Sequence, residues 1–129
     1  MEQRRHCKVY ASETASLTML ETLVHLHTAH LLESFTLLRI NVPDAQIMNA
    51  DMAALPDNWA DEEAPPALAE YGDVWCFTGS SVALRVPSAL SPVEYNYLLN
   101  PEHPDFYTLA LKAEAIPFRF DSRLKAEPR

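Results

Sequence analysis

Glu21, Ser88 and Tyr10 are the side chains of this sequence best placed to do chemistry. Glu21 interrupts an apolar stripe, four residues after Leu17 and three before Val24. A helix with this spacing turns the carboxylate toward its core-facing side. There the carboxylate either lines a cleft, where burial and hydrogen bonds set its charge state, or serves structure at the edge of the stripe or beside an arginine. The spacing alone leaves these alternatives open.

Tyr10 and Ser88 carry the other two candidate groups. Tyr10 lies on a predicted strand just before the helix that bears Glu21, where it faces the same cleft or is an ordinary half-buried strand residue. Ser88 follows Pro87 at the end of another predicted strand, a position at which a hydroxyl often bonds the backbone of a turn. No Gly-x-Ser-x-Gly motif surrounds Ser88, which argues against a Ser-His-Asp hydrolase.

The histidines and cysteines do not predict a metal site. A helical zinc site needs histidines four residues apart together with a further ligand. The histidines of the predicted helix are spaced by two and three residues, at His25, His27 and His30. We expect them at the surface or near the end of the helix. Cys7 and Cys76 are too far apart in the sequence to add a ligand set, and we expect free thiols.

Composition and charge restrict the class of protein. With 129 residues and 48% apolar content, the chain predicts one domain, residues 1–129, with a substantial core. Its net charge of −8 argues against nucleic acid as a partner. The sequence contains no signal-peptide h-region and no apolar run of membrane-spanning length, so we expect a cytoplasmic protein without membrane contact. Two glycines exclude a Gly-rich phosphate-binding loop.

The predicted elements mix helices and strands without regular alternation, which favours an α+β fold. A helix is expected from Ala15 to about Leu32, with its N-cap among residues 12–14. A second helix is expected from Pro66 through Tyr71, with Gly72 either breaking it or preceding another. Strands are expected at residues 8–11, 34–42, 82–86, 106–113 and 116–120.

The stretch from Leu84 to Phe106 is rich in proline. It contains Pro87, Pro92, Pro101 and Pro104, and each proline fixes φ and removes a backbone donor. The pattern therefore predicts an irregular segment after the strand that ends near Val86. Such a segment is either a loop that wraps the core or a rigid frame that holds Ser88.

Five blocks of the sequence, taken in order, resemble the RES-domain family. They are VYASETASLTMLETLVHL, LPDNW, GDVW, LRVPSALSPVEYNYLLNPEHPDF and FRFDSRL. The resemblance extends from Val9 over nearly the whole chain. Its most specific part is the fourth block, in which VPSA precedes an N-x-L-x-NP-x-HP-x-F pattern.

This resemblance implies a fold, a function and a set of site residues. RES domains are similar in fold to ADP-ribosyltransferase toxins, and are the toxins of bacterial toxin–antitoxin modules with an Xre-like antitoxin partner. They use NAD, either breaking its nicotinamide–ribose bond or moving ADP-ribose onto a protein. By this match Glu21 is the family glutamate that stabilises the transition state, and Ser88 and Tyr10 match a catalytic serine and a tyrosine that shape the nicotinamide–ribose pocket. A fixed carboxylate suits this chemistry because cleavage develops positive charge on the ribose.

The family arginine is the departure from this pattern. It belongs to a Gly-x-Arg-Trp-Asn-like motif upstream of the Tyr10 strand, whereas only MEQRRHCK precedes Val9 here. We therefore expect the chain to begin just inside the domain and to be impaired, with Arg4 or Arg5 as partial substitutes that bind the pyrophosphate.

Three hypotheses for the function follow from the resemblance. In the first the protein degrades NAD with phosphate or water as the acceptor, and in the second it transfers ADP-ribose to a protein side chain. In the third, favoured by the missing arginine motif, it is an inactive remnant that only binds an antitoxin. The sequence leaves both the acceptor and self-association open.

Overall fold

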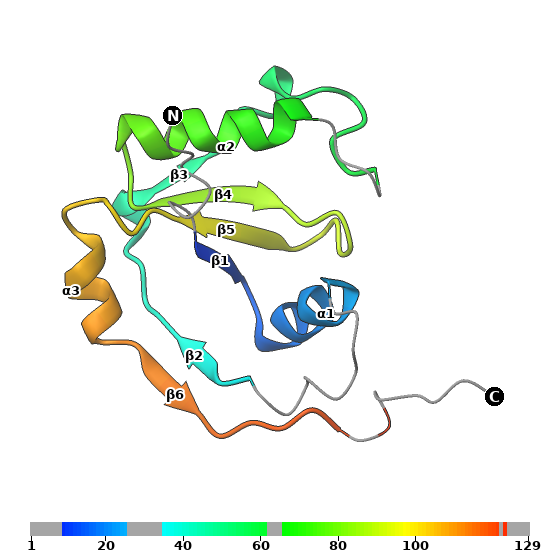
Figure 1. The fold of residues 1–129 in the computed structure, drawn as a ribbon, viewed down its shortest axis with the longest axis vertical. Coiled ribbons are helices and arrows are strands. Elements are labelled where there is room, and N and C mark those ends of the chain that lie inside the picture. Colours follow the sequence, from blue (N-terminus) through cyan, green and yellow to red (C-terminus); the bar gives the residue numbers. More distant parts are fainter. Residues whose placement is uncertain (1–8, 26–34, 62–65, 122, 124–129) are drawn as a thin grey trace, which may run out of the picture.

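A computed structural model describes residues 9–25, 35–61, 66–121 and 123 of the chain, and Figure 1 shows its helices and strands. The four-stranded sheet consists of β1 (Val9–Ser12), β3 (Ile47–Asn49), β4 (Ala83–Pro87) and β5 (Tyr95–Leu99). A two-stranded sheet consists of β2 (Leu37–Arg39) and β6 (Glu114–Ile116). The helices are α1 (Ala15–His25), α2 (Pro66–Thr78), α3 (Phe106–Leu111) and the short 3-10 turns η2 (Asp44–Gln46) and η3 (Met52–Ala54). This mixture confirms the predicted α+β fold.

The four-stranded sheet has the order β1-β5-β4-β3. β5 pairs antiparallel with both β1 and β4, whereas β3 joins β4 in parallel. The register places Ser12 opposite Asn96, and Asn96 opposite Val86. Because side chains that face each other across strands share one side of the sheet, Ser12, Asn96 and Val86 lie on one face. Ala11, Tyr97 and Arg85 form the neighbouring row, on the other face.

Each face of the sheet is covered by a different part of the chain. On the first face, Trp75 and Cys76 of α2 pack against the fully buried Leu84. On the second face, a buried cluster of Val82, Ala83 and Leu99 contacts side chains from the segment after β2 and from α3. Figure 1 shows α2 and the β2–β6 pair on opposite sides of the sheet. The burial of these apolar side chains is the main source of the sheet's stability.

α2 continues through the glycine that was expected to interrupt it. Gly72 is buried inside the helix, and a mid-helix glycine costs only about 1 kcal/mol relative to alanine. The packing of Trp75 and Cys76 on the sheet outweighs that cost. The helix ends at Thr78. The next residue, Gly79, has a φ of 66°, the left-handed conformation that commonly closes a helix, and its N–H donates to the Trp75 carbonyl.

The strand predicted at residues 106–113 is wrong, because Phe106–Leu111 forms α3. Phe106 and Leu109 are three residues apart and both pack against the buried cluster on the second face. Only a helix brings residues at this spacing to one side, so packing overrides the strand preference of the aromatic residues. The strand predicted at 116–120 is displaced as well, since β6 ends at Ile116.

Other predicted boundaries are partly correct. β1, the start of α1 and β4 lie where the sequence predicted them, within one residue. β2 is confined to Leu37–Arg39 instead of 34–42. The predicted continuation of the first helix toward Leu32 lies outside the described residues. The proline-rich stretch contains a regular strand, β5, since its prolines lie on either side of Tyr95–Leu99.

Candidate functional site

Helix α1 turns Glu21 toward the sheet. The helix begins after Thr14, whose hydroxyl accepts a hydrogen bond from the Leu17 backbone N–H at 3.1 Å, as an N-cap residue does. Leu17 is buried, with 2% of its surface exposed. Glu21 follows one turn later on the same side and is half-buried. The inward direction predicted for this carboxylate is therefore observed.

The connection after β4 fixes Ser88. Pro87 ends the strand, and the Ser88 backbone N–H donates to the Glu94 carbonyl at 2.9 Å. The Ser88 hydroxyl oxygen accepts hydrogen bonds from the backbone N–H groups of Leu90 and Ser91, at 3.1 and 3.0 Å. Ser88 has no exposed surface. It thus forms the backbone-bonding turn that its sequence position predicted.

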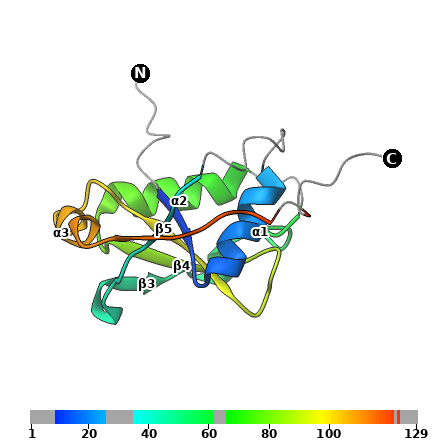
Figure 2. The same cartoon turned by 90° about the horizontal axis from the view of Figure 1, so that it is seen from below.

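The same hydroxyl also contacts Glu21. Ser88 Oγ donates to Glu21 Oε2 at 2.9 Å, and Asn96 Nδ2 donates to the same oxygen at 2.6 Å. Ser12 Oγ in turn donates to Asn96 Oδ1 at 2.7 Å. We call Ser12, Glu21, Ser88 and Asn96 the Glu21 cluster. It brings together α1, β1, β5 and the end of β4, and Figures 1 and 2 both show α1 beside the β4–β5 connection.

Hydrogen bonds around the cluster hold the start of α1 against that connection. The Glu13 backbone N–H donates to the Tyr95 carbonyl at 2.9 Å, and the Tyr95 N–H donates to Glu13 Oε1 at 2.8 Å. Thr14 Oγ1 donates to Glu94 Oε2 at 3.1 Å. Because these bonds join residues about eighty positions apart in the sequence, they fix the helix relative to the sheet. The Glu21 carboxylate is therefore oriented before any ligand arrives.

Tyr10 shares a sheet face with the cluster. It lies two residues before Ser12 on β1 and opposite Leu98, so the alternation of side chains puts Tyr10 and Ser12 on the same side. Its side chain is 74% exposed. An exposed ring on the same sheet face as the cluster can pack against a planar ligand group.

The other predicted ligand-binding residues, Arg4 and Arg5, lie outside the described residues. The described part of the chain instead presents Arg85, on the second face of the sheet, where its Nε donates to Tyr97 Oη at 3.1 Å. Neither Arg85 nor Asn96 was predicted from the sequence. The signal for Asn96 was its position within a run of tyrosine and leucine, because asparagine is disfavoured inside strands and its presence there calls for a polar partner.

Among the described residues, no group of three or more histidine, cysteine or acidic side chains is arranged to hold a metal ion. Two of the helix histidines, His27 and His30, lie outside the described ranges. The described helices are all too short or too polar to span a membrane. Within these ranges, the Glu21 cluster brings together Glu21 and Ser88, the carboxylate and the serine that were predicted from the sequence.

The arrangement can stabilise positive charge. Two side-chain donors fix one carboxylate oxygen of Glu21, so the group stays in place while charge develops on a neighbouring ligand. Preorganised charge of this kind acts without the cost of reorganisation during the reaction. Ser88 is too deeply buried to contact a ligand in this conformation, so its geometry suits the positioning of Glu21.

Comparison with known proteins identifies the family of this chain. The sequence model of the RES domain matches residues 3–121. A protein named Toxin Res from Yersinia enterocolitica is 40% identical over 93% of this chain and 79% of its own length. A Toxin Res from Photorhabdus laumondii is 38% identical over 90% of this chain and 74% of its own length. A Sphingobium protein named Prs ADP-ribosylating toxin is 38% identical over 75% of this chain and 62% of its own length. This chain therefore belongs to the RES-domain family.

Proposed function

We propose that this protein is the toxin of a RES-type toxin–antitoxin module and that it cleaves NAD at the nicotinamide–ribose bond. Its membership of the RES-domain family and the names of its relatives support the toxin role. The observation that carries the catalytic proposal is the pair of hydrogen bonds from Ser88 and Asn96 to one oxygen of Glu21. These bonds hold a carboxylate in a fixed orientation, as the cleavage requires.

In the proposed reaction the bond between ribose C1′ and the nicotinamide ring nitrogen breaks. Its electron pair leaves with nicotinamide, which becomes neutral, and positive charge develops on the ribose. The Glu21 carboxylate stabilises that charge. The hydrogen bonds from Ser88 and Asn96 hold this carboxylate in its orientation. The Tyr10 ring packs against the nicotinamide. Water then adds to C1′ and loses a proton, or phosphate adds in its place, to give ADP-ribose or its 1-phosphate.

The test is nicotinamide release from NAD by the purified chain, measured by liquid chromatography. We expect Glu21→Gln to abolish most of this activity, since the amide keeps the shape of the side chain but loses its charge. Glu70→Gln is the matched control, because Glu70 is an exposed glutamate on α2. Equal rates for the wild-type and Glu21→Gln proteins, both with a folded circular dichroism spectrum, would exclude Glu21 as the catalytic carboxylate.

The acceptor is identified from the product. Phosphorus NMR of reactions with and without inorganic phosphate separates ADP-ribose from its 1-phosphate. A second candidate function is ADP-ribosylation of a protein, and the observation that favours it is the name of the Sphingobium relative. That function predicts addition of the mass of ADP-ribose to a cellular protein, with little free ADP-ribose formed.

Arg4 and Arg5 are proposed to bind the NAD pyrophosphate. A combined Arg4→Ala and Arg5→Ala variant is then expected to raise the KM for NAD, while kcat changes less, because the phosphates lie away from the bond that breaks. An unchanged KM for NAD would show that neither residue binds the pyrophosphate.

The proposed partner is an Xre-like antitoxin, and the proposed place of action is the cytoplasm, where NAD is available. Expression without an antitoxin should deplete cellular NAD and stop growth, and Glu21→Gln should prevent both effects. Growth that is equally normal with either protein, at unchanged NAD, would favour a binding module without enzymatic activity.

A further inference from the structure

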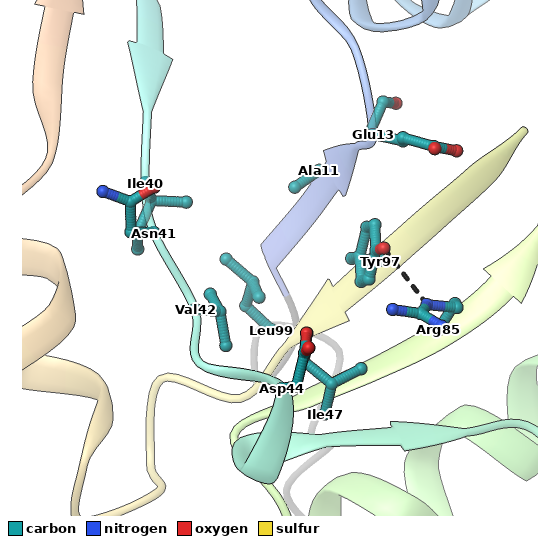
Figure 3. Close-up of a pocket in the computed structure, with 11 residues that line it drawn as sticks. Ala11, Glu13, Ile40, Asn41, Val42, Asp44, Ile47, Arg85, Tyr97 and Leu99 are labelled. Atoms are coloured by element: carbon teal, nitrogen blue, oxygen red, sulfur yellow. Dashed lines mark hydrogen bonds between the residues drawn. The ribbon is translucent and has the colours of Figure 1, made fainter.

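A pocket of about 280 Å³ lies on the second face of the sheet, away from the face that carries Asn96. One wall is formed by β1, β4 and β5, with Tyr97 and Arg85 side by side. The other wall is the segment between β2 and β3, which contributes apolar side chains and the polar Asn41 and Asp44 (Figure 3). Ser12, at the end of the edge strand β1, lines the pocket on this face and also donates to Asn96 on the other face.

Arg85 is the unusual group in this pocket. Its guanidinium carbon lies 5.3 Å from the centre of the Tyr95 ring and 5.6 Å from that of Tyr97, so two aromatic rings flank a half-buried cation. Its Nε donates to the Tyr97 hydroxyl. Within residues 9–25, 35–61, 66–121 and 123, no carboxylate forms an ion pair with it, and its two terminal amino groups have no hydrogen-bond partner.

An unpaired cation is unexpected in this protein. The chain carries 18 acidic and 10 basic side chains, so carboxylates are plentiful, and partly buried arginines are normally paired. Arg39 shows the ordinary arrangement, since it bonds Glu114 across the exposed β2–β6 pair. Arg85 instead is held in place by aromatic and hydroxyl contacts that leave its two terminal amino groups unused. This arrangement is suited to an anionic ligand.

The shape and lining of the pocket limit the kinds of anionic ligand that it can bind. A guanidinium presents two parallel donors that match the oxygens of a phosphate. The carboxylates of Glu13 and Asp44 can accept hydrogen bonds from sugar hydroxyls. The apolar side chains, which include Ile40 and Val42, can pack against a base. The volume lies just below the range typical of drug-sized ligands, about 300–1,000 Å³, so one nucleotide fits better than a dinucleotide.

We propose that this pocket binds a nucleoside monophosphate unit and that Arg85 holds its phosphate. This inference rests on the proposed function, in which the unit is the AMP half of NAD and the rest of the molecule reaches the Glu21 cluster around the edge strand β1, at Ser12. Free inorganic phosphate has the same chemistry toward Arg85, and as an acceptor for the cleaved ribose it is the other source of the anion.

Calorimetric titration of the full chain with AMP, adenosine and inorganic phosphate tests the proposal. We expect AMP to bind about tenfold or more tightly than adenosine, since charge-assisted hydrogen bonds to the phosphate contribute at least that factor. Arg85→Gln should remove this advantage, and Arg85→Lys, which keeps the charge but loses the paired donors, should keep part of it. Arg39→Gln is the matched control and should bind AMP as the wild-type protein does.

Each outcome decides between the alternatives. Equal AMP affinity of the wild-type and Arg85→Gln proteins, or an affinity for AMP no higher than for adenosine, overturns the proposal. Inorganic phosphate that binds as tightly as AMP, and only when Arg85 is present, overturns the nucleotide and identifies free phosphate as the ligand. If Arg85→Gln does not fold, Tyr97→Phe replaces it, because loss of the hydroxyl frees Nε and should weaken AMP binding severalfold.

The test also separates this inference from the catalytic proposal. Glu21→Gln should lose NAD cleavage but bind AMP normally, because Glu21 does not line the pocket. AMP binding that depends on Arg85 in a chain without NAD cleavage would keep the pocket and reject the proposed reaction. NAD cleavage that depends on Glu21, together with AMP binding that is unchanged by Arg85→Gln, would keep the proposed reaction and reject the proposed pocket.

Discussion

The Glu21 cluster and the Arg85 pocket hold charged groups in opposite ways. In the cluster the protein itself supplies the partners: the Ser88 hydroxyl makes three hydrogen bonds, and one of them fixes the Glu21 carboxylate. In the pocket Arg85 has a single hydrogen bond, to Tyr97, among the described residues. The first arrangement preserves a geometry, and the second leaves binding capacity for a ligand. Substitutions in the cluster should therefore affect rate and stability, whereas substitutions in the pocket should affect affinity.

The largest effect is expected from Glu21→Asp, which keeps the charge but shortens the side chain by one methylene. The aspartate carboxylate no longer reaches both Ser88 and Asn96, and a misplacement of about 1 Å can reduce a rate by about 100-fold. Single-turnover measurement of nicotinamide release checks this expectation, with AMP binding as the control that should not change. A loss of less than about tenfold would mean that charge alone, without the fixed geometry, is what the cluster provides.

A smaller effect on rate, joined to an effect on stability, is expected from Ser88→Ala. The alanine removes the donor to Glu21 and the acceptor for two backbone N–H groups. Backbone donors left without a partner cost about 1–3 kcal/mol of unfolding free energy. We expect kcat to fall about tenfold, with KM nearly unchanged, because Ser88 acts through Glu21.

Ser91→Ala is the matched control for this substitution. Ser91 lies in the same connection, and its hydroxyl donates to Glu94 instead of Glu21. Denaturant unfolding and steady-state kinetics of both variants give the comparison. A Ser88→Ala protein that loses stability but keeps full kcat would reduce Ser88 to a structural residue.

The sequence predicted the members of the cluster better than their contacts. The spacing of Glu21 after Leu17 gave the inward direction of the carboxylate, and the family resemblance named both Glu21 and Ser88. Their contact depends on the pairing of β5 with both β4 and β1, and it joins residues 67 positions apart in the sequence. Local periodicity carries no information about such pairing. For this reason the sequence analysis could name the two groups without showing that they touch.

The two groups that were missed, Asn96 and Arg85, were missed for different reasons. Asn96 lies on β5, which was hidden because the prolines of the whole stretch were counted together, although none falls inside Tyr95–Leu99. Arg85 alternates with Leu84 and Val86 on β4, so the strand pattern alone makes it a residue on the opposite face. Arg85 lines a pocket because the segment between β2 and β3 covers that face. The path of this segment depends on tertiary packing, which the local sequence pattern does not predict.

The smallest effect is expected from a third kind of charged group, the exposed pair of Asp121 and Arg123. Arg123 donates three hydrogen bonds to Asp121, at 2.8–2.9 Å, and these bonds lower the pKa of the Asp121 carboxyl to about 2 from its ordinary value of 3.8. The folded state therefore holds the ionised form more strongly than the unfolded state does. Any stability from the pair is complete above pH 3.8 and is lost as the pH falls through about 2.

Because both side chains are exposed, solvent and salt screen this contribution. We expect wild-type and Asp121→Asn proteins to have the same thermal midpoint at pH 7 within error, and to lose stability in parallel on acidification. A clear difference at pH 7 that disappears at pH 2 would show that an exposed carboxylate with three donors stabilises the fold as a buried cluster does. The contrast between cluster and pocket would then lie in the number of hydrogen bonds, and burial would no longer be needed to explain it.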